Sequence, residues 1–205
     1  MSGQRWRPVS PDGLVSELVE AVAGRPGTVR VAIDGPPCAA PDELAAALVT
    51  PLRALGRPTV TLSSRLFWRD ASVRLEHGRE DVESYLTWLD HTALQREVLR
   101  PAAERGEYLP SLRDPATDRS TRVAPRPLAP GGVLVVAGEL LQGLGLDFDL
   151  TVHLAVSPAA RARRTPAELA WTLPAFDEYD ETVRPADYAD IVVKLDDPAH
   201  PAVRA

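Results

Sequence analysis

Lysine and cysteine are almost absent from this chain of 205 residues. A single lysine, Lys194, stands against 22 arginines, and Cys38 is the one cysteine. One thiol excludes a disulfide scaffold and any zinc site built from several thiolates. The scarcity of lysine bears on function, because some active sites require a lysine at one fixed place in the sequence.

Long apolar runs and excess positive charge are lacking as well. No stretch approaches the roughly 18 apolar residues of a membrane span, and residues 1–13 contain no apolar core of a secretion signal. The formal net charge of −6 argues against a protein that binds nucleic acid by neutralising its phosphates. We therefore expect a soluble, cytoplasmic protein that binds neither nucleic acid nor membrane.

What the chain contains is an ordinary globular composition, with strand patterns alternating with helix patterns. Hydrophobic residues make up 44% and charged residues 25%, and the length suggests one domain over residues 1–205. Apolar, β-branched runs predict strands, and apolar residues at helical spacing predict helices between them. The predicted strands are 28–33, 58–63, 133–137, 149–155 and 190–195, and the predicted helices are 14–23, 41–55, 81–104 (two helices meeting near Asp90) and 157–171.

Strands that are apolar throughout and separated by helices imply an α/β fold of three layers, α/β/α, around a five-stranded, mainly parallel sheet. Residues 1–26 are predicted as an N-terminal helix segment, and residues 64–127 as an excursion that forms a lid or an acceptor region. In such sheets ligands bind beyond the carboxyl ends of the strands. The loops at 34–41, 63–80 and 137–145 should therefore line a site.

The loop after the first predicted strand stands where a phosphate-binding loop of the pattern G-x-x-x-x-G-K-[ST] would be. Here it reads Gly35-Pro-Pro-Cys-Ala-Ala-Pro-Asp42, so the second glycine, the lysine and the hydroxyl residue are replaced by Ala40, Pro41 and Asp42. Each proline removes an N–H group that could cradle phosphate, and alanine adopts positive φ less readily than glycine. By itself the segment also fits an ordinary strand-to-helix turn. Next to Glu43, we expect the Asp42 carboxylate to serve the amides at the start of the following helix, in a closed loop.

Further segments give the chain a specific family resemblance. They are VAIDG at 31–35, Arg65-Leu-Phe67-Trp68 after the second strand, Arg74 with Gly78, Glu80, Tyr85 and Leu89-Asp90, DPATDR at 114–119, VVAG at 135–138, and the arginine-rich RARR at 161–164. In this order the chain resembles uridine kinase-type P-loop proteins of the actinobacterial sort over about residues 28–198. The resemblance implies a P-loop NTPase-like fold. It also implies an enzyme that phosphorylates nucleosides with ATP and Mg²⁺.

The departures from that family fall on the catalytic positions. Besides the missing lysine, Arg65 replaces the acid that the family places after the second strand, and Ala137 replaces the acid at the end of the third. Lys194 lies too far along the fold to be an obvious substitute. Arginines could supply the positive charge of the missing lysine, and Glu139 could replace the acid lost at Ala137. Arg65 and Glu139 are therefore the catalytic candidates. Use of ATP and Mg²⁺ stays open, and the missing residues argue against it.

The resemblance also implies binding residues. Cofactor contacts would come from the degenerate phosphate loop and the lid: Gly35, Cys38, Ala39, Ala40, Asp42, Arg161 and Arg164. Substrate contacts would come from Phe67, Trp68, Arg74, Arg79, Tyr85, Asp90, Tyr108, Arg113, Asp114 and Arg119. The competing interpretation makes Tyr85 and Trp88 helix core residues and Asp114 a turn cap.

Other chemistry-bearing residues have simpler interpretations. His77 and His91 lack a third ligand at metal spacing and are expected to be solvated, and no metal site is predicted. His153 lies within a predicted strand and is expected to be a core residue with its hydrogen bonds satisfied. Cys38 stands near a helix N-terminus, where a thiolate is favoured, yet a plain small residue fits the position better.

Three hypotheses about function remain. The first is a uridine kinase-like protein whose ATP-dependent phosphorylation is lost or strongly weakened, and whose cleft still binds a nucleoside, a nucleotide or another phosphorylated metabolite. The second is an active enzyme, an atypical kinase for uridine- or cytidine-type nucleosides or an enzyme of another reaction, that uses arginines of the inherited cleft. The third is a non-catalytic interaction protein, for which a homodimer is one form.

Overall fold

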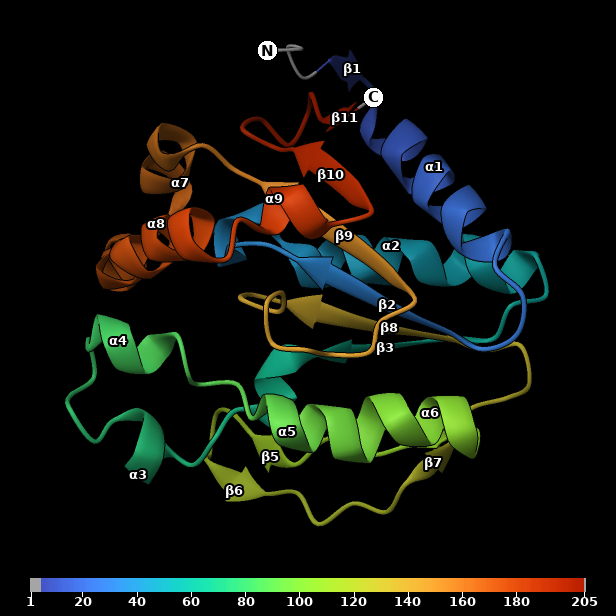
Figure 1. Ribbon diagram of the computed structural model, residues 1–205, viewed down its shortest axis with the longest axis horizontal. Helices are drawn as coiled ribbons and strands as arrows, with labels where there is room; N and C mark the ends of the chain where they lie inside the picture. Colours follow the sequence, from blue (N-terminus) through green and yellow to red (C-terminus); the bar gives the residue numbers. More distant parts are fainter. Residues whose placement is uncertain (1–4, 205) are drawn as a thin grey trace.

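A seven-stranded sheet organises the molecule (Figure 1). The computed structural model describes residues 5–204, so residues 1–4 of the predicted N-terminal segment lie outside the described residues. Five strands run parallel, in the order β3-β8-β2-β9-β10. Their bounds are β2 (Val29–Asp34), β3 (Thr59–Ser63), β8 (Val133–Gly138), β9 (Leu150–Ala155) and β10 (Ile191–Lys194). The predicted α/β fold with a mainly parallel sheet is confirmed.

Two short strands extend the sheet beyond the five that the sequence predicted. β11 (Ala202–Arg204) pairs antiparallel with β10, and β1 (Trp6–Pro8) pairs antiparallel with β11. The prediction of a five-stranded sheet missed them because three residues are too few to show an alternating pattern. Trp6 lies opposite Arg204, so the two ends of the described chain meet at one edge of the sheet.

Helices cover both faces of the sheet. On one face α1 (Pro11–Ala23) and α2 (Pro41–Ala54) pack on the apolar residues Val31, Ile33 and Leu154. On the other face, a helix built from α5 (His91–Leu94), a π turn (Gln95–Leu99) and α6 (Arg100–Glu104) packs on Ala32, Leu134 and Val136 (Figure 1). These are the three layers that the sequence predicted.

The segment between β3 and β8 holds short elements only. A 3-10 turn (Ser64–Phe67) is followed by α3 (Ala71–Arg74) and α4 (Val82–Tyr85). After α6, β4 (Glu107–Tyr108) pairs with β7 (Arg126–Pro127), and β5 (Arg113–Asp114) pairs with β6 (Arg119–Ser120). The second half of the predicted excursion 64–127 thus contains two small antiparallel pairs.

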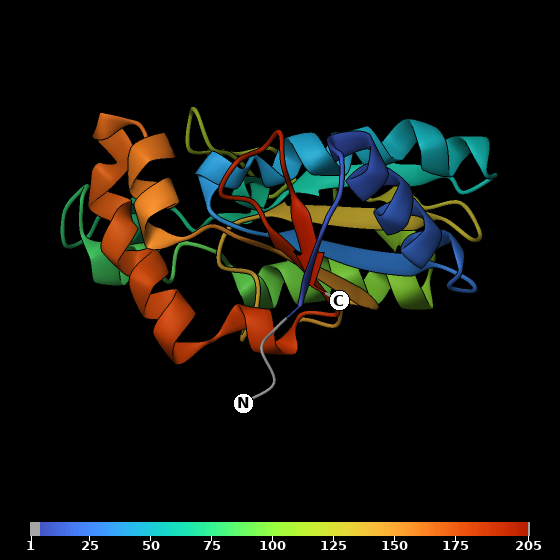
Figure 2. The same cartoon turned by 90° about the horizontal axis from the view of Figure 1, so that it is seen from above.

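The chain after β9 forms a helical cap beyond the carboxyl ends of the strands. Figure 2 shows α7 (Pro158–Arg164) and α8 (Leu173–Thr182) beyond one end of the sheet. The predicted helix 157–171 ends early, because Pro166 holds Thr165 in an extended conformation. A 3-10 segment (Ala167–Thr172) leads into α8, and α9 (Pro185–Tyr188) leads back to β10. Among the described residues, no helix is long and apolar enough to cross a membrane.

Arg57 ties the loops together at the amino ends of the strands. Its guanidinium donates hydrogen bonds to three backbone carbonyls: Gly131 at 2.7 Å, Arg25 at 2.7 Å and Gly27 at 2.8 Å. These carbonyls belong to the chain before β2 and the chain before β8. A planar, forked guanidinium can meet three acceptors that a single ammonium cannot.

We expect Arg57→Lys to lower the free energy of unfolding by about 1–3 kcal/mol, because it removes charged hydrogen bonds to buried or half-buried carbonyls. Urea denaturation measures the change. Arg163→Lys is the matched control, since Arg163 is exposed and donates only within its own helix, to Ala159. Equal effects of the two substitutions would contradict the role assigned to Arg57.

Candidate functional site

The carboxyl ends of β2, β3 and β8 converge at the edge of the sheet that the helical cap faces (Figure 1). Asp34 ends β2, and Arg65 follows β3 by two residues. Glu139 follows Gly138, the last residue of β8. A Cβ atom at Gly138 would lie 1.8 Å from the Ser64 hydroxyl oxygen, so only glycine lets the ends of β3 and β8 approach this closely.

The loop between β2 and α2 is closed on itself. Residues Pro37–Ala39 form a 3-10 turn in which the Ala39 N–H donates to the Pro36 carbonyl at 2.8 Å. The Ala40 N–H donates to the Pro37 carbonyl at 3.0 Å. Pro36 and Pro37 of the loop, and Pro41 at the start of α2, have no N–H group. Most of the donors that would cradle a phosphate are therefore missing or already bonded within the loop.

The backbone of the loop nevertheless keeps a conformation suited to glycine. Ala40 has φ of 53° and ψ of 54°, which is the left-handed region, at the place of the second glycine in the phosphate-loop pattern. Asp42 does not cap α2, contrary to expectation. It instead accepts a hydrogen bond from the Ser63 hydroxyl at 3.4 Å, because the second position of a helix directs its side chain sideways, toward the end of β3.

Of the two lid arginines proposed as phosphate ligands, only Arg164 bonds to the loop. Its guanidinium donates to the carbonyls of Cys38 and Leu195 and so fastens the loop to the end of β10. Arg161 is buried and bonds to two carboxylates of α8, Asp177 at 2.5 Å and Asp180 at 2.9 Å. Arg161 thus joins α7 to α8, and it lines a small pocket together with Gly35 and Pro36 of the loop.

Arg65 and Glu139, the two catalytic candidates, lie side by side. Arg65 Nε lies 3.4 Å from Glu139 Oε1, an ion pair without hydrogen-bond alignment. The Tyr85 hydroxyl donates to the same carboxylate oxygen at 3.2 Å. Burial raises the pKa of the Glu139 carboxyl above its usual value, against the opposing effect of Arg65. The Arg65 side chain is 39% exposed, so it presents a cation to solvent at this edge.

An aromatic cluster packs beside this pair. Tyr85 meets Trp88 and Trp171 edge-to-face, with ring centroids 4.9 Å and 5.3 Å apart. Arg74 is buried and lies 5.2 Å from the Trp68 ring and 4.8 Å from the Trp88 ring. Burial raises the pKa of the Tyr85 hydroxyl above its usual range, so the hydroxyl stays protonated. The cluster joins α4 to the helical cap.

The remaining predicted substrate residues are spread over the molecule. Phe67 and Tyr108 are buried in the core beneath α5 and α6. Asp90 caps α5 through the Ala93 N–H, and Asp114 caps a turn through the Ala116 N–H. Arg113 pairs with Asp70 and Asp118, whereas Arg79 and Arg119 are exposed. Their part in substrate binding stays a prediction.

The sequence did not identify Asp34 and Tyr179 as residues of this edge of the sheet. Asp34 is fully buried, and its carboxylate accepts from the Tyr179 hydroxyl at 2.9 Å and lies 2.8 Å from His153 Nδ1. Asp34 and His153 are register partners on adjacent strands. Asp34 is an acidic residue at the end of an apolar run, and this pattern could have identified it from the sequence. Within residues 5–204, no group of three His, Cys, Asp or Glu side chains could hold a metal ion.

Comparisons with known proteins give the fold. No protein-family model matches the chain, and no curated protein matches it. A solved structure described as a possible uridine kinase from Bacillus stearothermophilus superposes with a TM-score of 0.71 at 20% identity, covering 87% of this chain and 96% of that chain. A putative fructose transport system kinase from Silicibacter sp. TM1040 gives 0.53 at 18% identity, covering 82% of this chain and 95% of that chain. The chain therefore has the α/β fold of these two structures.

We expect Ala40→Gly to raise the free energy of unfolding by about 0.5–1 kcal/mol, because glycine adopts the left-handed conformation without strain. Urea denaturation measures the change. Ala39→Gly is the matched control, since Ala39 lies in the 3-10 turn with ordinary φ, and glycine there should lower stability by about 1 kcal/mol. A loss of stability in Ala40→Gly would contradict the assigned strain.

We expect Glu139→Gln to change how stability depends on pH. With its pKa raised, folded Glu139 keeps a proton that the unfolded chain has lost, so its contribution to stability is full below the usual glutamate pKa and is lost as pH rises through the raised value. The variant should gain stability relative to the wild type as pH rises above the usual glutamate value of 4.5. Denaturation at a series of pH values measures this gain, with the exposed Glu168→Gln as control. Parallel stability curves of wild type and Glu139→Gln would contradict the prediction.

Proposed function

We propose that this chain is a uridine kinase-like protein of the cytoplasm whose ATP-dependent phosphorylation is lost or strongly weakened, and that it binds a nucleoside, nucleotide or related phosphorylated metabolite. One observation carries the proposal: the loop that would hold the ATP phosphates is closed by its own hydrogen bonds. The Ala39 and Ala40 amides bond within it, the prolines of the loop and of the first turn of α2 offer no donor, and Arg164 fastens it to β10.

The charges around the loop support the loss of ATP use. Phosphoryl transfer depends on positioning and on donors that stabilise developing negative charge, and removing one such donor typically costs about 3–4 kcal/mol. Here Pro41 provides no cation and Asp42 adds a carboxylate at the start of α2. The carboxylate would repel the phosphates that the loop should attract.

The acceptor side supports retained binding. Arg65 presents a partly exposed guanidinium, which pairs well with phosphate or with sugar and base oxygens. Trp68 and Trp171, the half-buried members of the aromatic cluster beside it, offer ring surface on which a nucleobase can pack. A nucleoside-type ligand is the class that uses a cation and an aromatic surface together.

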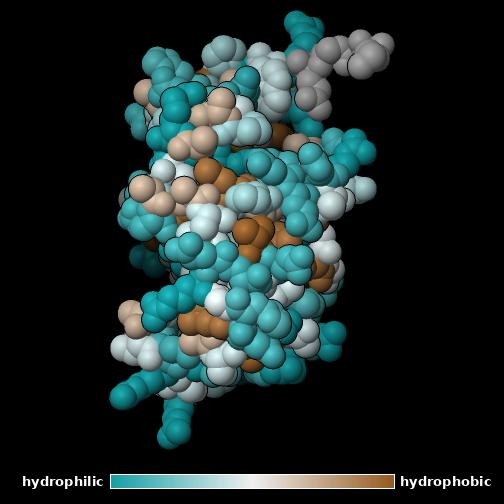
Figure 3. Space-filling model, turned by 90° about the vertical axis from the view of Figure 1, so that its left-hand side faces the viewer, coloured by the Kyte–Doolittle hydropathy of each residue, from teal (hydrophilic) through white to brown (hydrophobic). Residues whose placement is uncertain are grey.

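An active atypical kinase is the second candidate, and the position of Arg65 favours it. Arg65 lies where the family places an acid, and it pairs with Glu139, the nearest acid after β8. A guanidinium there could stabilise a transferring phosphate in place of the missing lysine. The interaction-protein alternative has less support, because Figure 3 shows a mostly hydrophilic face at the α7–α8 end with apolar side chains in small, separate areas.

Repairing the loop tests the proposal. The triple variant Ala40→Gly, Pro41→Lys, Asp42→Ser restores the full phosphate-loop pattern from Gly35 onward. Millimolar Mg-ATP should leave the melting temperature of the wild type unchanged and raise that of the variant, since a ligand at 100 times its Kd adds about 2.7 kcal/mol. Differential scanning fluorimetry measures both, and nucleosides should stabilise wild type and variant alike.

A triple variant with Pro41→Gln instead of Pro41→Lys is the matched control, because it opens the loop without adding the cation. Stabilisation of the wild type by Mg-ATP would overturn the proposal. Phosphate transfer from ATP to uridine or cytidine by the wild type, lost in Arg65→Ala, would establish the atypical kinase instead.

A further inference from the structure

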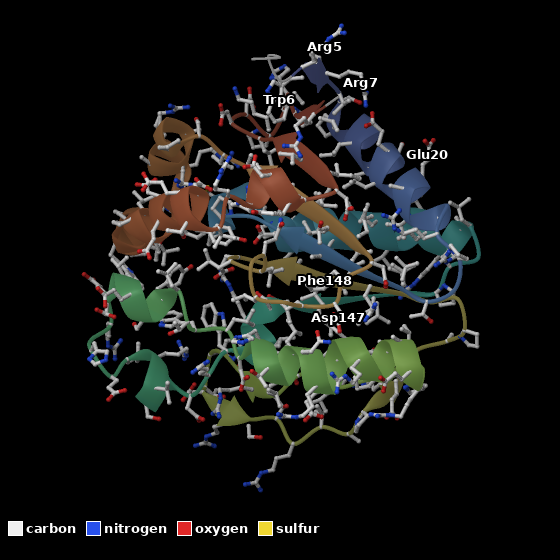
Figure 4. The ribbon with its side chains drawn as sticks, in the orientation of Figure 1. Arg5, Trp6, Arg7, Glu20, Asp147 and Phe148 are labelled. Atoms are coloured by element: carbon white, nitrogen blue, oxygen red, sulfur yellow. The ribbon has the colours of Figure 1, made fainter. Side chains whose placement is uncertain are left out.

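A cavity of about 390 Å³ lies on the β9–β10 side of the sheet, and Arg65 is not among its lining residues. Its floor is formed by β9 and β10 through His153, Ala155 and Lys194. Its walls come from the start of α7, the end of α8, α9 and Trp6 of β1, which is labelled in Figure 4. The volume falls within the range of small-molecule sites. The chain's one lysine thus faces a cavity at the carboxyl ends of two parallel strands.

His153 is held in the floor of this cavity by a buried hydrogen-bond network. The Asp34 carboxylate accepts from the Leu141 N–H and the Tyr179 hydroxyl, both at 2.9 Å, and its Oδ2 lies 2.8 Å from His153 Nδ1. Burial and the nearby Asp34 raise the pKa of the Tyr179 hydroxyl above its usual range, so that hydroxyl donates. Because donors surround the Asp34 carboxylate, both of its oxygens act as hydrogen-bond acceptors.

The network fixes the role of each imidazole nitrogen. Because Asp34 accepts, His153 Nδ1 carries a hydrogen and donates it. In the neutral ring the other nitrogen, Nε2, then has a free lone pair. His153 is 4% exposed and lines the cavity. Because the Asp34 carboxylate fixes the orientation of this nearly buried imidazole, Nε2 can accept a hydrogen bond from a bound molecule.

The charges of the lining favour an anionic partner for Lys194. Asp180 is neutralised by Arg161 at 2.9 Å, and Asp187 by Arg184 at 2.5 Å. The Lys194 ammonium has only a longer contact, 3.6 Å to Asp196, an acid outside the lining.

Lys194 and His153 belong to adjacent strands, β10 and β9. Lys194 lies two residues beyond Val192, the register partner of His153, so both side chains occupy one face of the sheet.

We propose that this cavity binds a small hydroxylated acid, a molecule that joins a phosphate or carboxylate group to a hydroxyl-bearing carbon skeleton. Lys194 pairs with the acid group, His153 Nε2 accepts from a hydroxyl, and the Trp6 ring covers the carbon skeleton. This cavity is separate from the region around Arg65 at the ends of β3 and β8, which we call the acceptor edge. The proposal does not require that the proposed nucleoside binding be correct.

The single lysine permits a direct test. Reductive methylation with ¹³C-formaldehyde labels amines and keeps their positive charge, so it reports on Lys194 and the amino terminus alone. D-ribose 5-phosphate and D-gluconate present the two acid groups, and D-ribose and inorganic phosphate present the hydroxyls or the anion alone. We expect one or both hydroxylated acids to shift the Lys194 signal saturably, with the amino-terminal signal unchanged and the two partial probes at least tenfold weaker.

Variants separate recognition from folding. His153→Asn retains a donor near the position of Nδ1 for Asp34 and removes Nε2. Calorimetry should show binding weakened about tenfold or more in His153→Asn and in Lys194→Met, and largely retained in Lys194→Arg. Melting temperatures close to that of the wild type would show that each variant is folded.

Three results would overturn the proposal. No shift of the Lys194 signal with either hydroxylated acid at 10 mM, about the weakest affinity expected of a small-metabolite site, is one. Binding that survives both His153→Asn and Lys194→Met is another. Binding that persists in those variants but is lost in Arg65→Ala would place the ligand at the acceptor edge, which would support the proposed function and reject this cavity as its site.

Discussion

The buried carboxylate of Asp34 is the constraint on which the carboxyl edge of the sheet depends. A carboxylate removed from water must be compensated by donors, and three separate segments supply them: β9 through His153, α8 through Tyr179, and the chain after β8 through Leu141. The Tyr179 hydroxyl also accepts from the Gln142 N–H, which locks the same segment a second time. Removing Asp34 would leave these donors without a shared partner, and α8 would lose one of its attachments to the sheet.

This network divides the edge into two regions of different character. Toward β3 and β8, the loop is closed, and Arg65, Glu139 and the aromatic cluster fill the space between the sheet and the cap. Toward β9 and β10, a cavity remains open, with a cation and an imidazole on its floor. The chain shares the α/β fold of the two kinase structures it superposes on, and its donors and cations are divided between these two regions of the edge.

The five parallel strands could be predicted because both faces of each are covered, so that a strand such as Val133–Gly138 is apolar along its whole length. The prolines of the β2–α2 loop allow the prediction that the loop is closed. They do not predict which hydrogen bonds close it. Arg161 was beyond sequence reasoning, because its partners Asp177 and Asp180 lie 16 and 19 residues away on another helix. Asp34 and His153 form a pair only through strand register, which a linear pattern does not contain.

Trp6 belongs both to the edge strand that joins the two ends of the described chain and to the wall of the Lys194 cavity. A short edge strand is held by few backbone hydrogen bonds, so it is among the first parts of a sheet to open. Opening it would withdraw the indole and widen the cavity mouth. Access to the cavity is therefore linked to the pairing of β1 with β11.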